Sequence, residues 1–425
     1  MARNVFLSVL GSSSYKECVY SYPNGAYKSE KVRFIQEAML SNIAKEWSEK
    51  DAAYIFLTKG EKGSRIKNWI DKDSKTEGLC SRLKNLELKF AVNDVDIPDG
   101  NSEDEIWQLF EIMFNQLKDS DRLYIDITHS FRYLPLLLIV LVNYAKFLKN
   151  ISVESITYGN WEAREEETNE APIVNLTSFA LLQDWTSAAK DFIDYGKVSK
   201  VVSLLSNHEV KGKAGQNIFD FKKKLKDLEG IFYTVRGQKI VKGQIFKEIQ
   251  SNLDLITQKT SIKPLIPIAD KLKEKISPFN TSEDLMNGFV SAKWCVKHGL
   301  IQQAFTIAQE TIISKFCVYA GLNSRNKNDR GLISSILSIA KTKKPFNKTN
   351  LNEKQIELVD SLLLDKFVID IADAYRELTK FRNNINHAGF IGDDDWSVFE
   401  KCFEKFFNQC FLVIEKMNSN AYKPL

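Results

Sequence analysis

The stretch Leu123-Tyr124-Ile125-Asp126-Ile127-Thr128-His129-Ser130 decides the fold of the first part of this chain. Its first half is an apolar run typical of a buried strand. It ends in small polar residues, just before a helical segment that carries Pro135 in its first turns. A buried strand, a polar loop and a helix form the repeating unit of a parallel sheet with helices on both faces. We therefore predict a strand over 123–127 in such a sheet.

Four further apolar runs in the first part of the chain repeat this pattern. They lie at 5–10, 53–57, 86–92 and 153–159. Helical spacing follows two of them, from about residue 31 to 47 and from about 102 to 117, with Ser102 as N-cap. The predicted fold is an α/β, Rossmann-like domain with a parallel sheet flanked by helices. Ligands bind such sheets beyond the carboxyl ends of the strands.

The loops that should meet at this edge of the sheet are rich in hydroxyl groups, glycine and positive charge. Helix N-termini there offer unpaired amides and a positive dipole end, which suit a phosphate. We therefore predict a nucleotide or phosphodiester site. Its candidate residues are Gly11, Ser12, Ser13, Thr58, Lys59, Gly60, Asp126, Thr128, His129, Ser130, Arg132, Tyr158 and Gly159. The alternative is simple helix capping, with Ser130 as N-cap and His129 as a surface residue.

From about residue 181 the strand signals fade and long amphipathic segments dominate. The predicted domains are 1–180, a helical connecting or inserted region at 181–280, and a mostly α-helical domain at 281–425. Helices are expected across 184–205, 284–320, 351–387 and 395–417. The polar, basic segment 323–350 is interpreted as a partly mobile loop. The cations from Arg325 to Lys348 either hold single-stranded RNA or are solvated at the surface.

The segment Arg382-Asn383-Asn384-Ile385-Asn386-His387 carries the second candidate site. RNA supplies its own nucleophile, the 2′-OH, so an arginine and a histidine could cleave it without a metal. Arg382 would stabilise the charge on the phosphorane, and His387 would transfer a proton or position the 2′-OH. Asn383 would hydrogen-bond Arg382, His387 or the substrate. The alternative is that His387 is a helix C-cap and Arg382 a surface residue.

Helix geometry adds a constraint to this second site. Five residues of an ideal helix turn through about 140°, so Arg382 and His387 do not share one helix face. Gly389 indicates that the helix ends near His387. We therefore predict a half-site that a second copy of the chain completes.

Composition sets limits on the class of protein. The formal net charge of +4 neither demands nor excludes a nucleic-acid partner. The six cysteines include no Cys-x-x-Cys pair, so we expect no zinc site and a reduced, cytoplasmic compartment. The N-terminal apolar run is too short for a signal peptide. The longest run, 134–142, is too short for a membrane span and is predicted to be a buried helix. His208 and His298 are expected to be structural, and Trp161 with the acidic residues after it to form an exposed loop.

Two motifs resemble one known family. Asp126-Ile127-Thr128-His129-Ser130 is similar to the Asp-x-Thr-His-Gly signature of CRISPR-associated proteins that join an N-terminal CARF domain to a C-terminal HEPN domain, with Ser130 in place of Gly. The segment 294–304 resembles an early helix of the HEPN domain, and Arg382 to His387 matches its Arg-x4-His signature. The resemblance is weakest in 211–275, whose role is left open.

This resemblance implies both a ligand and a reaction. The CARF domain would bind cyclic oligoadenylate, made by a type III CRISPR complex, and thereby activate the HEPN domain as a non-specific single-stranded endoribonuclease. Its products would carry a 2′,3′-cyclic phosphate and a 5′-OH. The family works as homodimers, here a homodimer or a higher oligomer, with no metal, no cofactor and no membrane. Cyclic tetra-adenylate is the default activator and cyclic hexa-adenylate the second choice.

Two other functions remain open at this point. One is a nucleotide-sensing regulator that lacks nuclease activity. The other is a ring nuclease, a CARF domain that also cleaves its own ligand. The residues that would position the ligand's 2′-OH for that reaction are Ser12, Ser13, Thr58, Lys59 and Thr128. The base preference of RNA cleavage is not predicted.

Overall fold

A computed structural model of the chain describes residues 2–59, 63–70, 77–129, 132–206, 213–259, 265–390 and 394–419. The chain forms two compact units, Met1–Gln183 and Asp184–Leu425. The predicted subdivision of the second unit at residue 280 stays a prediction. None of the helices in the described ranges is long and apolar enough to cross a membrane.

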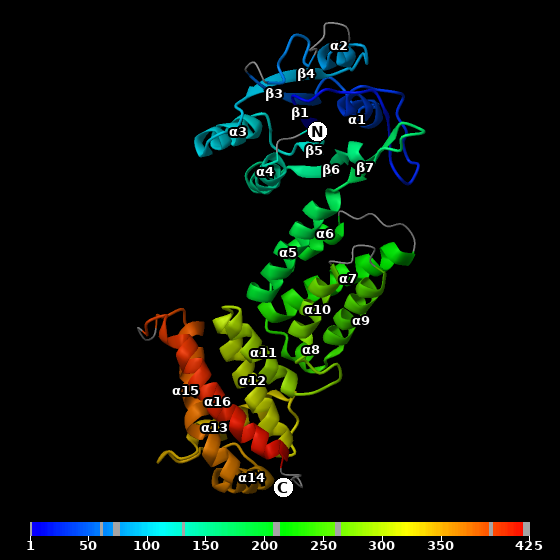
Figure 1. The fold of residues 1–425 in the computed structure, drawn as a ribbon. Helices are drawn as coiled ribbons and strands as arrows, with labels where there is room; N and C mark the ends of the chain where they lie inside the picture. Colours follow the sequence, from blue (N-terminus) through cyan, green and yellow to red (C-terminus); the bar gives the residue numbers. More distant parts are fainter. Residues whose placement is uncertain are drawn as a thin grey trace. The chain divides into compact units, whose positions relative to one another are not determined.

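The first unit is built on one sheet, which has seven strands within the described residues, in the order β2-β7-β6-β5-β1-β3-β4 (Figure 1). The strands are β1 (Asn4–Leu10), β2 (Val19–Ser21), β3 (Ala52–Thr58), β4 (Ala91–Ile97), β5 (Arg122–Asp126), β6 (Ser152–Gly159) and β7 (Glu170–Asn175). Strands β4, β3, β1, β5 and β6 pair in parallel, and β7 pairs antiparallel with β6. The predicted α/β, Rossmann-like fold is confirmed.

Helices cover both faces of this sheet (Figure 1). They are α1 (Ile35–Ile43), α2 (Leu79–Lys84), α3 (Glu103–Asn115) and α4 (Leu134–Lys149), with a short 3-10 helix, η1 (Trp161–Ala163). Alternate residues of β1 face opposite cores. Phe6 and Leu10 pack with α1 and α2, whereas Val5, Leu7 and Val9 pack with α3 and α4. Burial on both faces explains why this strand is a continuous apolar run.

The order of the strands fixes where a ligand would bind. The chain moves from β1 outward to β3 and β4, then returns to the other side of β1 to form β5 and β6. The strand order therefore reverses between β1 and β5, and such a reversal opens a crevice at the carboxyl ends of the two strands. The loops after β1 and β5 meet at this crevice.

Two sequence predictions for this unit were wrong in their bounds. The strand expected at 86–92 is β4, which spans Ala91–Ile97. It is the edge strand of the sheet, so polar residues such as Asp94 lie on it and hid it from a search for apolar runs. The helix expected from about 31 to 47 is the shorter α1, because the Glu37 carboxylate accepts the backbone N–H of Phe34 (2.9 Å) and fixes the start at Ile35.

Helix α4 is not the buried helix that its apolar sequence predicted. One face is buried, with Leu134, Leu138 and Leu141 in the core beneath the sheet. The other face is apolar but exposed, and Phe147 is 85% exposed. The exposed apolar residues of this helix are Leu136, Ile139, Val140, Tyr144, Phe147 and Leu148.

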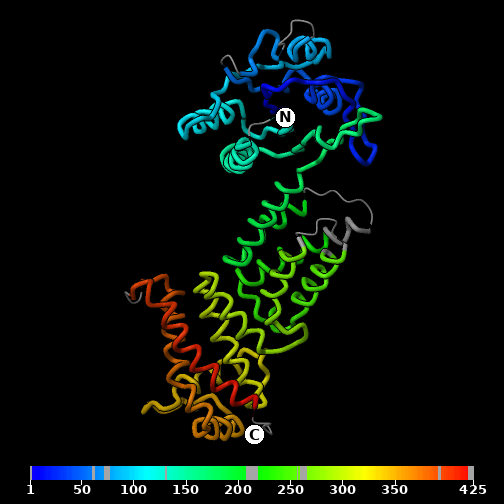
Figure 2. The backbone as a smooth tube through the Cα atoms, in the orientation of Figure 1, coloured from blue at the N-terminus to red at the C-terminus, as the bar shows by residue number. Residues whose placement is uncertain are grey.

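The second unit is helical throughout its described residues (Figure 2). Helix α5 (Thr177–Tyr195) enters it from the first unit. The remaining helices are α6 (Ser199–Ser206), α7 (Lys213–Tyr233), α8 (Gly237–Val241), α9 (Gln244–Lys259), α10 (Leu265–Ile276), α11 (Met286–Lys297), α12 (Ile301–Tyr319), α13 (Lys327–Ile339), α14 (Glu353–Leu364), α15 (Lys366–Asn386) and α16 (Val398–Ser419). The predicted mostly α-helical character is confirmed.

The segment 323–350 is not the partly mobile loop that its polarity suggested, because α13 lies within it. The Asn326 side chain caps this helix by accepting the N–H groups of Asn328 and Asp329. Leu332 and Ile336, one turn apart, lie on its buried face. Most of the cations of the segment lie in the loops on either side of α13, and Arg330 within it bonds to Glu310 of α12; together these charges masked the helical spacing.

Candidate functional site

Asp126 organises the crevice between β1 and β5 from a buried position at the end of β5. One carboxylate oxygen accepts the Ser8 hydroxyl of β1 (2.7 Å), and the other accepts the Thr128 N–H (3.1 Å) and its hydroxyl. Ser8 in turn accepts a hydrogen bond from Gln36 (3.0 Å). Burial raises the pKa of Asp126, and the hydrogen bonds from Thr128 and Ser8 act against that shift. Asp126 thus orients the turn that carries Thr128.

Thr128 joins the end of β5 to the end of β6. Its hydroxyl oxygen accepts the N–H of Gly159 (2.8 Å) while donating to Asp126. On the other side, Gly11 lets the end of β1 approach closely, since a Cβ there would lie 2.9 Å from the carbonyl oxygen of His129. The predicted residues from three strand ends therefore meet at one rim.

His129 lies on this rim, against Tyr15. The two rings meet edge to face with their centroids 4.6 Å apart, and the Tyr15 hydroxyl donates to the carbonyl of Gly11 (2.8 Å). The Nε2 atom of His129 is enclosed and has no hydrogen-bond partner among the described residues. Burial lowers the pKa of His129 to about 4, so the imidazole is neutral near pH 7. Tyr15 has no motif around it and was missed in the sequence.

The outer part of the rim, after β3, uses its polar groups internally. The Thr58 hydroxyl accepts the N–H of Ser64 (3.0 Å), and the Ser64 hydroxyl accepts the N–H of Thr58 (3.0 Å). Both side chains are buried. Lys59 forms an ion pair with Asp96 of β4 (3.0 Å), which Arg65 also contacts. Thr58 and Lys59 thus stabilise the loop after β3.

The remaining candidates of the first unit differ in exposure. Ser13 and Arg132 are exposed, whereas Ser12 and Tyr158 are half-buried. Gly60 and Ser130 lie outside the described residues.

A cation–π pair in the loop after β6 was not predicted from the sequence. The Arg164 guanidinium lies over the Trp161 ring, 4.3 Å from its centroid, and its Nε is enclosed without a hydrogen-bond partner among the described residues. Trp161 is half-buried against the core beneath α1. The expectation of a simple exposed loop was therefore wrong for Trp161, although Glu162 and Glu165 are exposed.

The second candidate site lies at the C-terminal end of α15. Arg382 is half-buried there, and its Nη1 donates to the Asn383 side-chain oxygen (3.2 Å). Its Nε is enclosed and has no partner among the described residues. One side of this guanidinium is thus fixed by Asn383, and the rest of it stays available to an anion.

His387 is exposed at the C-cap of α15. The helix ends in a reversal in which the Gly389 N–H donates to the Asn384 carbonyl (3.1 Å), and Gly389 has φ +73°. The imidazole makes no hydrogen bond to any described residue. The helix therefore ends where the sequence indicated, and Arg382 and His387 do not bind each other.

Contacts from neighbouring helices hold this helix end. Gln302, at the start of α12, donates to the Asn386 side-chain oxygen (3.5 Å), and Asn384 donates to Asp394 (3.1 Å). Two aromatic residues that the sequence did not single out, Phe390 and Trp396, are 93% and 84% exposed beside it in sequence. The site is open to a large substrate.

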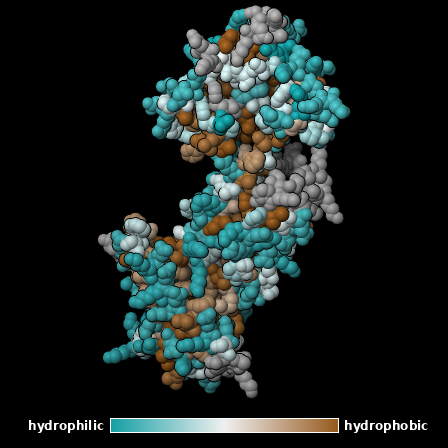
Figure 3. All heavy atoms as spheres, in the orientation of Figure 1, coloured by the Kyte–Doolittle hydropathy of each residue, from teal (hydrophilic) through white to brown (hydrophobic). Residues whose placement is uncertain are grey.

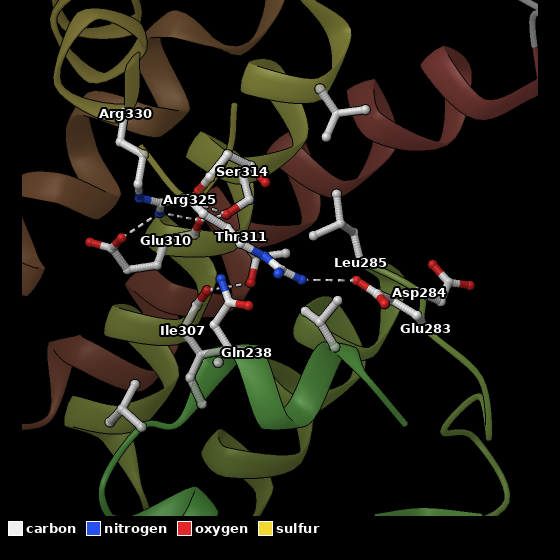
Figure 4. Close-up of a pocket in the computed structure, with 15 residues that line it drawn as sticks. Gln238, Glu283, Asp284, Leu285, Ile307, Glu310, Thr311, Ser314, Arg325 and Arg330 are labelled. Atoms are coloured by element: carbon white, nitrogen blue, oxygen red, sulfur yellow. Dashed lines mark hydrogen bonds and ion pairs between the residues drawn. The ribbon is translucent and has the colours of Figure 1, made fainter. Parts of the chain in front are cut away.

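The cations at the start of the basic segment 325–348 form ion pairs with carboxylates of the second unit. They line a cavity of about 490 Å³ in which Arg325 pairs with Glu283 (3.4 Å) and Arg330 with Glu310 (2.5 Å) (Figure 4). Arg330 also donates to the Ser314 hydroxyl (2.7 Å). These pairs favour a structural role for the two arginines over RNA binding.

The remaining histidines are not part of either candidate site. His298 is buried, its two ring nitrogens face the carbonyl oxygens of Trp294 and Ile193, and it is structural as expected. His208 lies outside the described residues. Across the described ranges, no three His, Cys, Asp or Glu side chains gather in a way that could hold a metal ion.

Known proteins are similar to this chain in its first unit and beyond. Residues 5–162 match the family model of the CARF domain of the CRISPR system endoribonuclease Csx1. The CRISPR-associated protein MJ1674 of Methanocaldococcus jannaschii is 25% identical over 308 residues, which cover 69% of this chain and 42% of that protein. The chain thus spans about two fifths of the length of this curated relative.

A solved structure is similar over almost the whole chain. It is Enterococcus italicus Csm6 bound to cyclic hexa-2′-fluoro-hexa-dAMP, with 11% sequence identity and a TM-score of 0.48 over 99% of this chain and 96% of that one. At this TM-score the similarity carries no argument about ligand or activity.

Proposed function

We propose a function for this chain on the premise that its first unit is a CARF domain of the CRISPR-associated type. In this proposal the chain is a metal-independent endoribonuclease that cuts single-stranded RNA without base specificity when cyclic oligoadenylate binds the CARF domain. The observation that carries the proposal is the presence, in one chain, of a CARF sheet and of an intact Arg-x4-His motif at an open helix end.

The rim of the CARF domain suits a phosphodiester ring. It lies at the strand-order reversal between β1 and β5, where ligands bind open α/β sheets. Exposed Ser13 and Arg132 supply a hydroxyl group and a charge, and Arg164 adds a guanidinium that no described carboxylate neutralises. His129 lies against Tyr15 on this rim. Cyclic tetra-adenylate remains the default ring and cyclic hexa-adenylate the second choice.

The helix end of α15 suits the cleavage of RNA. The 2′-OH attacks the adjacent phosphorus, the bond to the 5′ oxygen breaks, and the products carry a 2′,3′-cyclic phosphate and a 5′-OH. Arg382, fixed on one side by Asn383, stabilises the charge that builds on the phosphate oxygens. His387 of the second copy takes the proton from the 2′-OH and gives it to the 5′ oxygen as that oxygen leaves.

The exposed apolar face of α4 supports the homodimer in this proposal. Its residues recur at 136, 139, 140, 144 and 147, the spacing of one helix face. Figure 3 shows hydrophobic surface gathered in this region of the first unit. A continuous apolar face of this kind marks an interaction surface, and a two-fold axis would place one α4 against another. The dimer would also bring two Arg-x4-His motifs together.

Cleavage of the ligand by the CARF domain is the less favoured alternative. Three of the groups suggested for it already have partners in the rim: Thr58 binds Ser64, Lys59 pairs with Asp96, and Thr128 binds Asp126. Chromatography of the ligand after incubation with the His387→Ala protein tests this alternative, and a linear product would support it.

One panel of reactions tests the proposed function. Purified protein is incubated with labelled RNA and EDTA, and each cyclic oligoadenylate is added in turn. We expect cleavage with one ring size, products that end in a cyclic phosphate, and no cleavage without a ring. Absence of cleavage with every ring would contradict the proposal, and cleavage that requires added metal would contradict the mechanism.

A further inference from the structure

A second cavity in the helical unit has no role in the function proposed above. It encloses about 460 Å³ between one face of α10, one face of α11 and the end of α5. On α11 its lining residues are spaced as one helix face, from Val290 to Lys297. We call it the α10–α11 groove; its lining is Ile193, Lys271, Glu274, Lys275, Pro278, Phe279, Val290, Lys293, Trp294 and Lys297.

Positive charge gathers in this groove without matching negative charge. Of its four lysines, Lys271 pairs with Glu274 (2.7 Å). Lys275, Lys293 and Lys297 have no carboxylate within ion-pair distance among the described residues. Like charges held together in a concave surface repel one another, and an anion that enters between them relieves that repulsion.

The pKa of Lys275 reflects the repulsion between the lysines of the groove. Burial lowers the pKa of its ammonium group, and the neighbouring charge of Lys297 lowers it further. Asp194 of α5 acts in the opposite direction but lies beyond ion-pair distance. A phosphate oxygen in the groove would provide the counter-charge that no described side chain provides.

The rest of the lining is largely apolar. Pro278 is exposed, Ile193 and Val290 are half-buried, and Trp294 and Phe279 are buried. A lining that combines positive charge with apolar surface matches a nucleotide, which has a phosphate and a flat base. The volume falls within the range of small-ligand pockets.

The groove is connected through α11 and α12 to the helix end that carries Arg382 and His387. Lys297 is the last residue of α11, and α12 begins at Ile301. Gln302 of α12 binds Asn386 of α15. In Figure 2 the end of α11, the start of α12 and the end of α15 lie at the same end of the bundle formed by α11 to α16. An RNA strand at the Arg-x4-His motif could therefore reach the groove.

We propose that the α10–α11 groove is an anion site that binds a phosphate-bearing nucleotide unit through Lys275, Lys293 and Lys297. The unit comes either from the single-stranded RNA substrate or from a free nucleotide. The RNA source rests on the function proposed above, whereas the anion site itself does not.

The test compares two triple variants in a His387→Ala background, so that the RNA stays intact. One is Lys275→Gln/Lys293→Gln/Lys297→Gln. Its control, Lys222→Gln/Lys223→Gln/Lys226→Gln, removes the same charge from α7. Binding of a short labelled RNA is measured by anisotropy over a range of salt. The groove variant should bind at least about tenfold more weakly, with a log–log salt slope lower by about 2, since each phosphate contact contributes about 0.7. The control should stay close to the parent.

A second measurement does not depend on RNA. Inorganic phosphate and AMP should raise the unfolding temperature of the parent and of the control, because a ligand stabilises the state that binds it. They should not raise that of the groove variant. If the groove variant loses this rise in unfolding temperature but binds RNA as the parent does, the groove is an anion site whose ligand is a free nucleotide. If both triple variants behave alike in both measurements, the proposal is overturned, whether or not the chain cleaves RNA.

Discussion

The rim of the first unit and the helix end of the second are built in opposite ways. At the rim, Asp126, Thr128 and Gly159 are hydrogen-bonded to one another across two strands. At the helix end, Arg382 and His387 do not contact each other. The imidazole makes no hydrogen bond to any residue that the structure describes. The first site is preorganised within one chain. The second holds the groups that we propose to react, but one chain does not bring them together, as expected of a half-site that a second copy completes.

The largest effect should come from His387→Ala. Removing a proton-transfer group should lower ligand-stimulated RNA cleavage by about a thousandfold. The affinity for the cyclic oligoadenylate should not change, because the rim does not involve this residue. Initial rates on labelled RNA and calorimetric titration of the ligand measure the two quantities. A rate within tenfold of the parent would show that His387 is only a helix cap.

Mixing two inactive variants tests whether Arg382 and His387 act from different chains. Arg382→Ala chains and His387→Ala chains, dissociated and reassociated together, form mixed dimers that contain one Arg382 and one His387 on different chains. If these two groups act across the dimer, about a quarter of the parent rate should return. If each chain carries its own complete site, the mixture stays inactive, and the half-site interpretation fails.

The next largest effect concerns the exposed face of α4. Phe147→Glu places a charge where the proposed dimer buries an aromatic ring on each copy. Self-association should weaken at least about a hundredfold, since each ring contributes about 2 kcal/mol of burial. Analytical ultracentrifugation measures it. Leu364→Glu, at an equally exposed apolar residue of the second unit, is the control and should leave self-association unchanged.

The smallest effect is a pH dependence at the rim. The pKa of His129 falls from an ordinary value near 6.5 to about 4 on folding. The folded state therefore binds fewer protons, and stability is lost as pH falls. The loss from about pH 7 to about pH 5 should be about 2 kcal/mol. His129→Phe cannot titrate, so its unfolding free energy should depend less steeply on pH. Equal slopes for the two proteins would contradict the buried, neutral imidazole.

The sequence predicted correctly those strands and helices whose residues all lie in one kind of environment. Strand β1 is buried on both faces, so its apolar run is unbroken. Strand β4 is an edge strand, and Asp94 and Asp96 interrupt its run. Helix α13 was hidden in a similar way, because the cations around it outweighed the spacing of Leu332 and Ile336. Elements that mix buried apolar residues with exposed charges are therefore the ones that sequence patterns place wrongly.

The candidate sites show the same limit. Motifs led to Asp126, Thr128 and Arg382 because each lies at a strand or helix end that the sequence marks. Tyr15 contacts His129 at the rim, and Arg164 lies over Trp161 in the loop after β6, but neither belongs to a motif. The α10–α11 groove depends on how α10 packs against α11 and the end of α5, so its lysines appear in the sequence as ordinary solvated charges. No local pattern encodes such a juxtaposition.

The hydrogen bonds that run from Gln36 through Ser8, Asp126 and Thr128 to Gly159 have a mechanical consequence. They cross the sheet at right angles to the strands and tie one helix and three strand ends together. Sliding β5 past either neighbour would break at least one of them in a largely buried setting, where a lost bond is costly. We therefore expect the rim to resist shear between these strands. A ligand bound there would then shift the three strand ends together.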